Sequence, residues 1–137
     1  MKKQLVAALL YCLTTPPAVA GGYVYDCDIP SNRDRPGWIP AKMGIVLGED
    51  GSVTVLDPII LQFHEKPMQA SVQRNDDRKL SIVWTLTNVE NADKQKAAQF
   101  SYTAQVNKKN NRISVSARPE GYSNRFHGRG KCVIRTE

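Results

Sequence analysis

Residues that catalyse reactions or bind metals are scarce in this chain. Its 137 residues include only two histidines, His64 and His127, and three cysteines. No HxH, HExxH or Cys-x-x-Cys arrangement occurs, and no glycine-rich phosphate loop leads into a helix. We therefore expect no metal and no cofactor. The adjacent His64 and Glu65 would point to opposite faces of a strand, so we interpret them as a surface pair and expect no enzyme activity. A pair of carboxylates distant in sequence, as in glycosidases, is the catalytic arrangement that the sequence leaves open.

Long hydrophobic runs are also lacking after the first twenty residues. The hydrophobic fraction of 41% and charged fraction of 23% are ordinary for a folded domain, which excludes a disordered tail, collagen, a coiled coil and a multi-pass membrane protein. Residues 1–20 combine Lys2 and Lys3, an apolar run over 5–13, and Ala18-Val19-Ala20. This pattern predicts a signal peptide cleaved after Ala20. We expect the residues that remain, 21–137, to form a single β domain. We expect a bacterial periplasmic or secreted protein.

The cysteines predict one disulfide. Cleavage after Ala20 removes Cys12 and leaves Cys27 and Cys132, and an even number of cysteines in an exported protein favours a bridge. These two residues lie near opposite ends of the domain, so the bridge would close a loop of about 105 residues. We expect the disulfide to be structural, because the pair has none of the spacing of a redox motif.

Two-residue alternation of apolar and polar side chains recurs along the domain. It is clearest over residues 80–87, where Leu80, Ile82, Trp84 and Leu86 share one face. Alternating runs at 100–106 and 112–118 flank a polar cluster and predict a hairpin, as do 42–47 and 52–56 around two glycines. Further strands are expected over 24–29, 68–73 and 131–135. Residues 59–63 fit either a strand or a helical turn, and residues 91–98 favour one or two helical turns.

About eight short antiparallel strands, joined covalently from first to last, predict an all-β fold. A small β-barrel places the disulfide where the sheet would otherwise have two free edges. A β-sandwich uses the same strand pattern and is the alternative. In either architecture Trp84 and Tyr102 are expected in the core.

Positive charge is concentrated at the C-terminal end of the chain. Residues 21–106 hold nine Lys or Arg against eleven acidic residues, whereas residues 107–137 hold eight against two. Two segments combine arginine with aromatic residues, and each adjoins one cysteine. If the first and last strands pair antiparallel, both segments lie at one end of the molecule. Arginine matches phosphate and carboxylate groups, and tryptophan offers a stacking surface. The predicted ligand-binding residues are Arg33, Arg35, Trp38, Arg125, His127 and Arg129.

These observations favour an exported, non-catalytic binding module that engages an anionic partner through its C-terminal basic region. The export signal argues against nucleic acid and favours anionic lipid, glycan or an acidic protein surface. One alternative is an inhibitor or structural partner of an envelope protein. Another is a carrier of a small apolar ligand in a barrel cavity, which bulky Trp84, Phe100 and Tyr102 would oppose by filling the interior.

Overall fold

The computed structural model describes residues 22–30, 37–90 and 96–136 of the chain. The expected signal peptide, residues 1–20, lies outside them, as do Arg33 and Arg35. Within these ranges the chain forms one antiparallel sheet, with a short helix inserted between the third and fourth strands. In the same ranges, no helix is long and apolar enough to cross a membrane.

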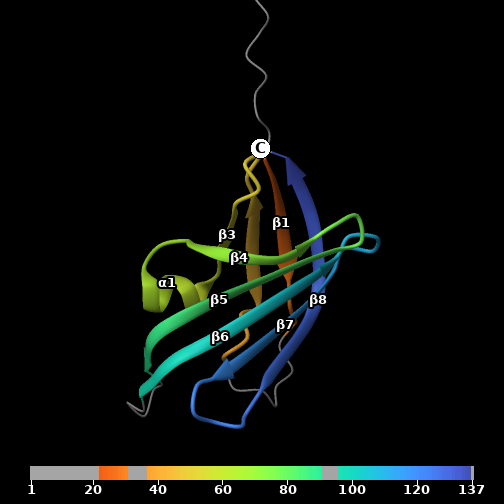
Figure 1. Cartoon of the computed structure of the whole chain (residues 1–137). Coiled ribbons are helices and arrows are strands. Elements are labelled where there is room, and N and C mark those ends of the chain that lie inside the picture. The colour runs from red at the N-terminus through yellow and green to blue at the C-terminus, as the bar shows by residue number, and fades with distance from the viewer. Residues whose placement is uncertain (1–21, 31–36, 91–95, 137) are drawn as a thin grey trace, which may run out of the picture.

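The sheet is a closed barrel in which each strand pairs with its neighbours in sequence (Figure 1). The last strand returns to the first and pairs with it antiparallel, so the sheet closes on itself. Of the two architectures that the sequence predicts, the barrel is therefore confirmed. The strands are β1 (Tyr23–Asp28), β2 (Lys42–Leu47), β3 (Val53–Leu56), β4 (Met68–Asn75), β5 (Lys79–Glu90), β6 (Lys96–Asn107), β7 (Arg112–Pro119) and β8 (Phe126–Thr136).

Apolar side chains alternate into the barrel interior, as the sequence pattern predicts. On β5, the four residues Leu80, Ile82, Trp84 and Leu86 are all buried. Tyr102 of β6 is buried as well, and its ring stacks on that of Trp84 with centroids 5.4 Å apart and planes 6° from parallel. Burying large aromatic rings contributes strongly to the stability of a small core. The interior is a packed core.

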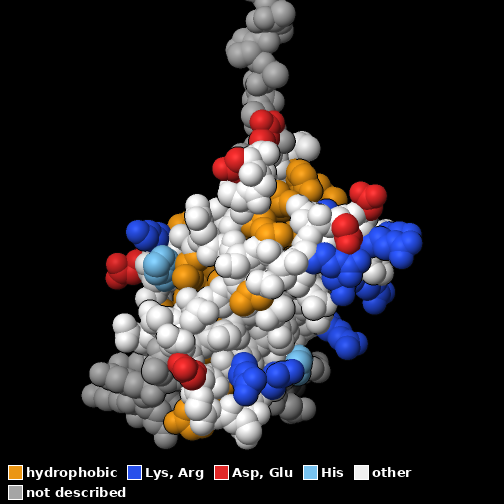
Figure 2. All heavy atoms as spheres, in the orientation of Figure 1, with side chains coloured by type: hydrophobic (Ala, Val, Ile, Leu, Met, Phe, Trp, Pro, Cys, Tyr) orange, Lys and Arg blue, Asp and Glu red, His pale blue; other side chains and the backbone are white. Residues whose placement is uncertain are grey.

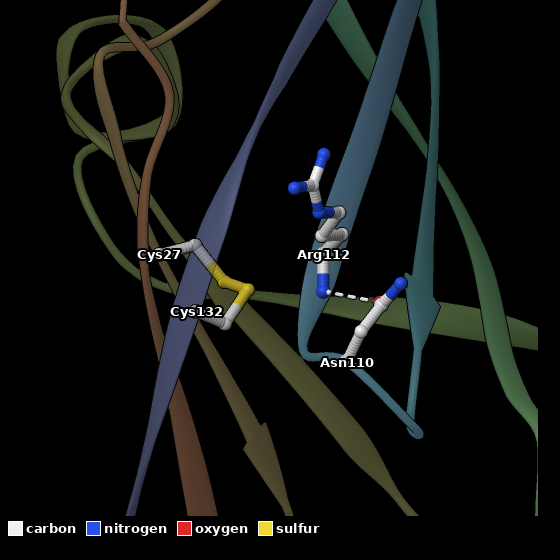
Figure 3. The surroundings of a disulfide bond; sticks show 4 residues. All are labelled: Cys27, Asn110, Arg112 and Cys132. Carbon is white, nitrogen blue, oxygen red and sulfur yellow. Dashed lines mark hydrogen bonds between the residues drawn. A yellow bond between two sulfur atoms is a disulfide. The ribbon is translucent and has the colours of Figure 1, made fainter.

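The predicted disulfide joins Cys27 of β1 to Cys132 of β8 (Figure 3). The two cysteines are direct partners in the register of the β1–β8 pair, and both are buried. The covalent bond therefore lies where the first and last strands of the barrel meet.

Residues 59–63, for which the sequence allows a strand or a helical turn, lie in helix α1 (Pro58–His64). Asp57 begins the helix: its carboxylate accepts hydrogen bonds from the backbone N–H groups of Ile59 and Ile60, at 2.7 and 2.8 Å. Pro58 favours the first helical position because its fixed φ suits it. Ile59 and Ile60 are buried against the core, so α1 belongs to the hydrophobic core.

The helical turns expected over residues 91–98 are wrong for Lys96, Ala97 and Ala98, which begin β6. Val89 of β5 pairs with Ala97, and Glu90 pairs with Lys96. Hydrogen bonding to a neighbouring strand outweighs a local helix propensity that amounts to tenths of a kcal/mol per residue. The remainder of that segment, residues 91–95, lies outside the described ranges.

Asp57 gives a test of the α1 cap. Asp57→Ala is expected to lower the free energy of unfolding by about 1–2 kcal/mol, because two backbone N–H groups lose their acceptor. Asp57→Asn keeps an acceptor oxygen and removes the buried charge, so its stability at neutral pH should match or exceed the wild type.

Burial raises the pKa of the Asp57 carboxyl above its usual 3.8, although the two backbone donors lower it. Folding therefore favours the protonated form. The stability of the wild type should fall relative to Asp57→Asn as pH rises from 3.8 through the raised pKa, and the difference should then stay constant. Urea titrations from acid to neutral pH measure this. An Asn variant as unstable as the Ala variant would contradict the capping role.

Candidate functional site

The described residues of the predicted patch lie at one end of the barrel. β1 and β8 pair antiparallel, with Asp28 opposite Lys131, so the chain that follows β1 runs beside the start of β8. Arg125 comes directly before β8, while His127 and Arg129 lie on it, and all three side chains are exposed. The antiparallel pairing that would bring the two arginine-containing segments together is therefore present.

Trp38 is half-buried and packs on the core at this end. Its ring stacks on Phe100, with centroids 4.5 Å apart and planes 26° from parallel. The Tyr102 hydroxyl donates a hydrogen bond to the Trp38 carbonyl oxygen at 3.0 Å. Phe100 also stacks on Phe126, with centroids 6.4 Å apart. One face of the Trp38 ring is therefore covered, and this residue is less available for stacking than the sequence suggests.

Strand pairing adds three cations to the exposed residues of the patch. On the outer surface, Arg112 of β7 lies opposite Lys131 of β8. Ser116 of β7 pairs with His127. Arg118 lies two positions further along β7, so it is on the same outward side of the strand, and it is exposed. We call this surface the basic face; it consists of Arg112, Arg118, Arg125, His127, Arg129 and Lys131. In Figure 2, Lys and Arg side chains gather beside a histidine low in the view and, separately, on the side of the barrel that carries the β4–β5 and β6–β7 turns.

No described acidic residue forms an ion pair with the basic face. Asp26 and Asp28 lie on the adjacent β1, but Arg135 binds Asp26 at 3.0 Å and Lys42 binds Asp28 at 3.1 Å. Neither Arg135 nor Lys42 belongs to the face. The third described ion pair joins Arg74 to Asp76 near the β4–β5 turn. The carboxylates of Asp26 and Asp28 are therefore both engaged by cations outside the basic face, although Asp28 stands opposite Lys131 in the strand register.

Comparison with known proteins adds no assignment. Neither a protein-family model, nor a curated protein, nor a solved structure matches this chain.

A groove of about 680 Å³ adjoins the basic face near the β6–β7 turn. Arg112, Arg129 and Lys131 belong to both the face and the groove. Ser114 stands opposite Arg129 and contributes a hydroxyl group. The remaining residues that line the groove are Asp28, Pro30, Lys79, Gln105, Asn107, Asn110, Ile113, Gly130 and Val133. Its dimensions fall in the range of small-molecule sites.

The residues that the sequence-based patch omits are Arg112, Arg118 and Lys131. Their alternation with buried neighbours could have placed them outward: Ile113 and Ala117 are buried on β7, and Cys132 is buried on β8. The pairing between β7 and β8, however, depends on the register of residues far apart in sequence. Sequence alternation could therefore indicate which side each cation faces, but not that the cations form one surface.

Proposed function

We propose that this protein is an exported, non-catalytic binding module whose basic face engages an anionic partner. The proposal rests chiefly on one observation: five cations and His127 lie on the outer surface of β7, β8 and the residue before β8, without a described acidic partner. Arg112 and Lys131 are directly opposite each other. Like charges in this position destabilise a strand pair. Asp28 faces Lys131 from β1 but is shared with Lys42, so a bound anion would offset the repulsion that remains.

The compartment favours some anions over others. Residues 1–20 have the pattern of a signal peptide, and the Cys27–Cys132 disulfide is of a kind that persists in oxidising compartments. Outside the cytoplasm, anionic lipids, glycans and acidic protein surfaces are commoner partners than nucleic acid. A carrier function is disfavoured because Trp84, Phe100 and Tyr102 fill the interior of the barrel.

Retention on an anionic surface tests the proposal. The disulfide-bonded protein would be applied to vesicles of phosphatidylglycerol and to immobilised heparin, at low and at high salt. Each basic residue near an anionic surface contributes about 1 kcal/mol, so the double variant Arg125→Ala/Arg129→Ala should bind about 30-fold more weakly at low salt. High salt should reduce the difference by screening exposed charges.

A matched control removes the same charge elsewhere. Lys66 follows α1 and Arg74 lies on β4, both exposed and outside the basic face. Lys66→Ala/Arg74→Ala should retain wild-type binding to within about threefold, because these charges lie away from the contact surface. Equal binding by the wild type and by Arg125→Ala/Arg129→Ala, on both surfaces, would refute the proposal.

A further inference from the structure

Hydrogen-bond donors outnumber acceptors among the side chains that line the groove beside the basic face. Asn107 ends β6 and Asn110 lies in the β6–β7 turn. Their side-chain oxygens accept from the backbone N–H groups of Lys109 and Arg112, at 3.0 and 3.1 Å. Figure 3 shows the Asn110 amide beside the Arg112 backbone nitrogen. A backbone N–H can only donate, so the interacting amide atom is the oxygen. Each of these oxygens is thus held by the backbone, whereas the described hydrogen bonds leave both NH₂ groups available to donate to a ligand.

Gln105 has the same polarity on the adjoining strand. Its Oε1 accepts a hydrogen bond from the Lys79 ammonium group at 3.2 Å, which leaves the Gln105 NH₂ group as a donor. Gln105 pairs with Ser114 of β7, and Ser114 pairs with Arg129 of β8. A row across three strands therefore brings an amide, a hydroxyl and a guanidinium to one side of the groove.

Cations complete the donor set. The groove is also lined by three cations: Arg112 on β7, and Arg129 and Lys131 on β8. Their guanidinium and ammonium groups are hydrogen-bond donors. Asp28 is the acidic residue among the described lining residues, and Lys42 binds its carboxylate at 3.1 Å. The donors come from β5, β6, β7, β8 and the β6–β7 turn, so they approach the groove from several directions.

We infer that this groove binds a phosphate ester, and this inference rests on the proposed function. A phosphate group has three terminal oxygens arranged tetrahedrally, which can accept from donors on several sides, whereas a carboxylate has two oxygens in one plane. Arginine forks and amide NH₂ groups suit such oxygens. The groove of about 680 Å³ is large enough for the esterified group as well as the phosphate. The exposed Val133 and Pro30 at its lining offer apolar contact to a sugar or glycerol moiety.

Calorimetric titration of the disulfide-bonded protein with matched ligands tests this inference. Glucose phosphorylated on its primary hydroxyl and glucuronate differ chiefly in carrying a phosphate or a carboxylate on the same ring. Two more hydrogen bonds to a charged group would make the phosphorylated sugar bind at least about tenfold more tightly than glucuronate. Inorganic phosphate and vesicles containing phosphatidic acid identify the source: tighter binding of either ester than of inorganic phosphate supports an ester site. Equal affinity for phosphosugar and glucuronate, or no binding of any phosphate ligand, would overturn the inference.

Neutral variants separate the groove from general charge attraction. Gln105→Met and Asn110→Ser each remove an NH₂ donor without changing the net charge, and the hydroxyl introduced by Asn110→Ser would keep an oxygen for the turn. Each should weaken binding of the phosphorylated sugar about tenfold. Gln99→Met, at an exposed position on β6 outside the groove, should have no effect.

The two proposals fail differently. Salt-sensitive retention by the basic face, combined with no effect of Gln105→Met and Asn110→Ser on phosphosugar binding, would overturn the phosphate-ester inference and leave the proposed function standing. If Arg125→Ala/Arg129→Ala bound the anionic vesicles and heparin as tightly as its control variant does, the proposed function itself would be refuted.

Discussion

Replacing Cys27 and Cys132 together with serine is expected to lower the free energy of unfolding by about 4–5 kcal/mol. The two residues are 105 positions apart, so their bond removes a large part of the conformational freedom of the unfolded chain in the loop-entropy account. Domains of this size are typically stable by about 5–15 kcal/mol, so the loss should bring the barrel close to unfolding at ordinary temperature. Urea denaturation of the wild type and the double variant measures the difference.

Reduction of the wild type provides the matching control. Treatment with a thiol reductant under unfolding conditions should lower the urea midpoint to that of the double variant, because both remove the same constraint. A loss below about 1 kcal/mol in either experiment would show that the bond restricts the unfolded chain far less than the loop-entropy account predicts. That result would assign the closure of the barrel to hydrogen bonding and packing alone.

Gly130→Ala is expected to destabilise the barrel by about 3 kcal/mol or more, at the upper end of the range for overpacking substitutions. A Cβ atom at this position would overlap the carbonyl oxygen of Asp28 and lie 2.9 Å from the Cα atom of Ile29. Both are backbone atoms where the chain leaves β1, so a side-chain rotation cannot relieve the contact. Thermal and urea unfolding of the purified variant would measure the cost.

Gly44→Ala is the matched control for Gly130→Ala. Gly44 lies on β2, and an added Cβ would approach only the Leu56 carbonyl oxygen, at an ordinary 3.8 Å. The same methyl group is added to a strand of the same barrel, so its effect should stay within about 1 kcal/mol. Gly128→Ala should fall between them, because its Cβ would meet side-chain atoms of Ile39 and Ile29, which can move. Equal effects at Gly130 and Gly44 would contradict the close approach of the chain after β1 to β8.

The strands and the disulfide could be predicted because their signals are local or are settled by elimination. The alternation of apolar and polar residues from Leu80 to Leu86 indicates a half-buried strand by itself. Cys27 has only Cys132 as a partner once Cys12 is assigned to the signal peptide. The choice of a barrel follows from the antiparallel pairing of β1 with β8, which the disulfide suggests. The helix prediction fails over Lys96 to Ala98 because pairing with β5 determines their conformation, and local sequence carries little information about such pairing.

The candidate site was only partly predictable for a related reason. Arg125, His127 and Arg129 are close in sequence and could be grouped by inspection, whereas Arg112 joins them through a register with β8 that alternation does not specify. The donor character of the groove depends on which atom of Asn107, Asn110 and Gln105 is already engaged. That property arises from the turn and from a cross-strand contact, so composition cannot reveal it.

Closure of the barrel by β1 and β8 also makes the order of the strands cyclic. Tyr23 pairs with Thr136, so the first and last described strands begin and end beside each other at one rim (Figure 1). Joining these ends and opening the chain at a turn elsewhere would leave every strand with the same two neighbours. The fold is therefore compatible with circular permutation, and no strand is structurally obliged to come first in the sequence.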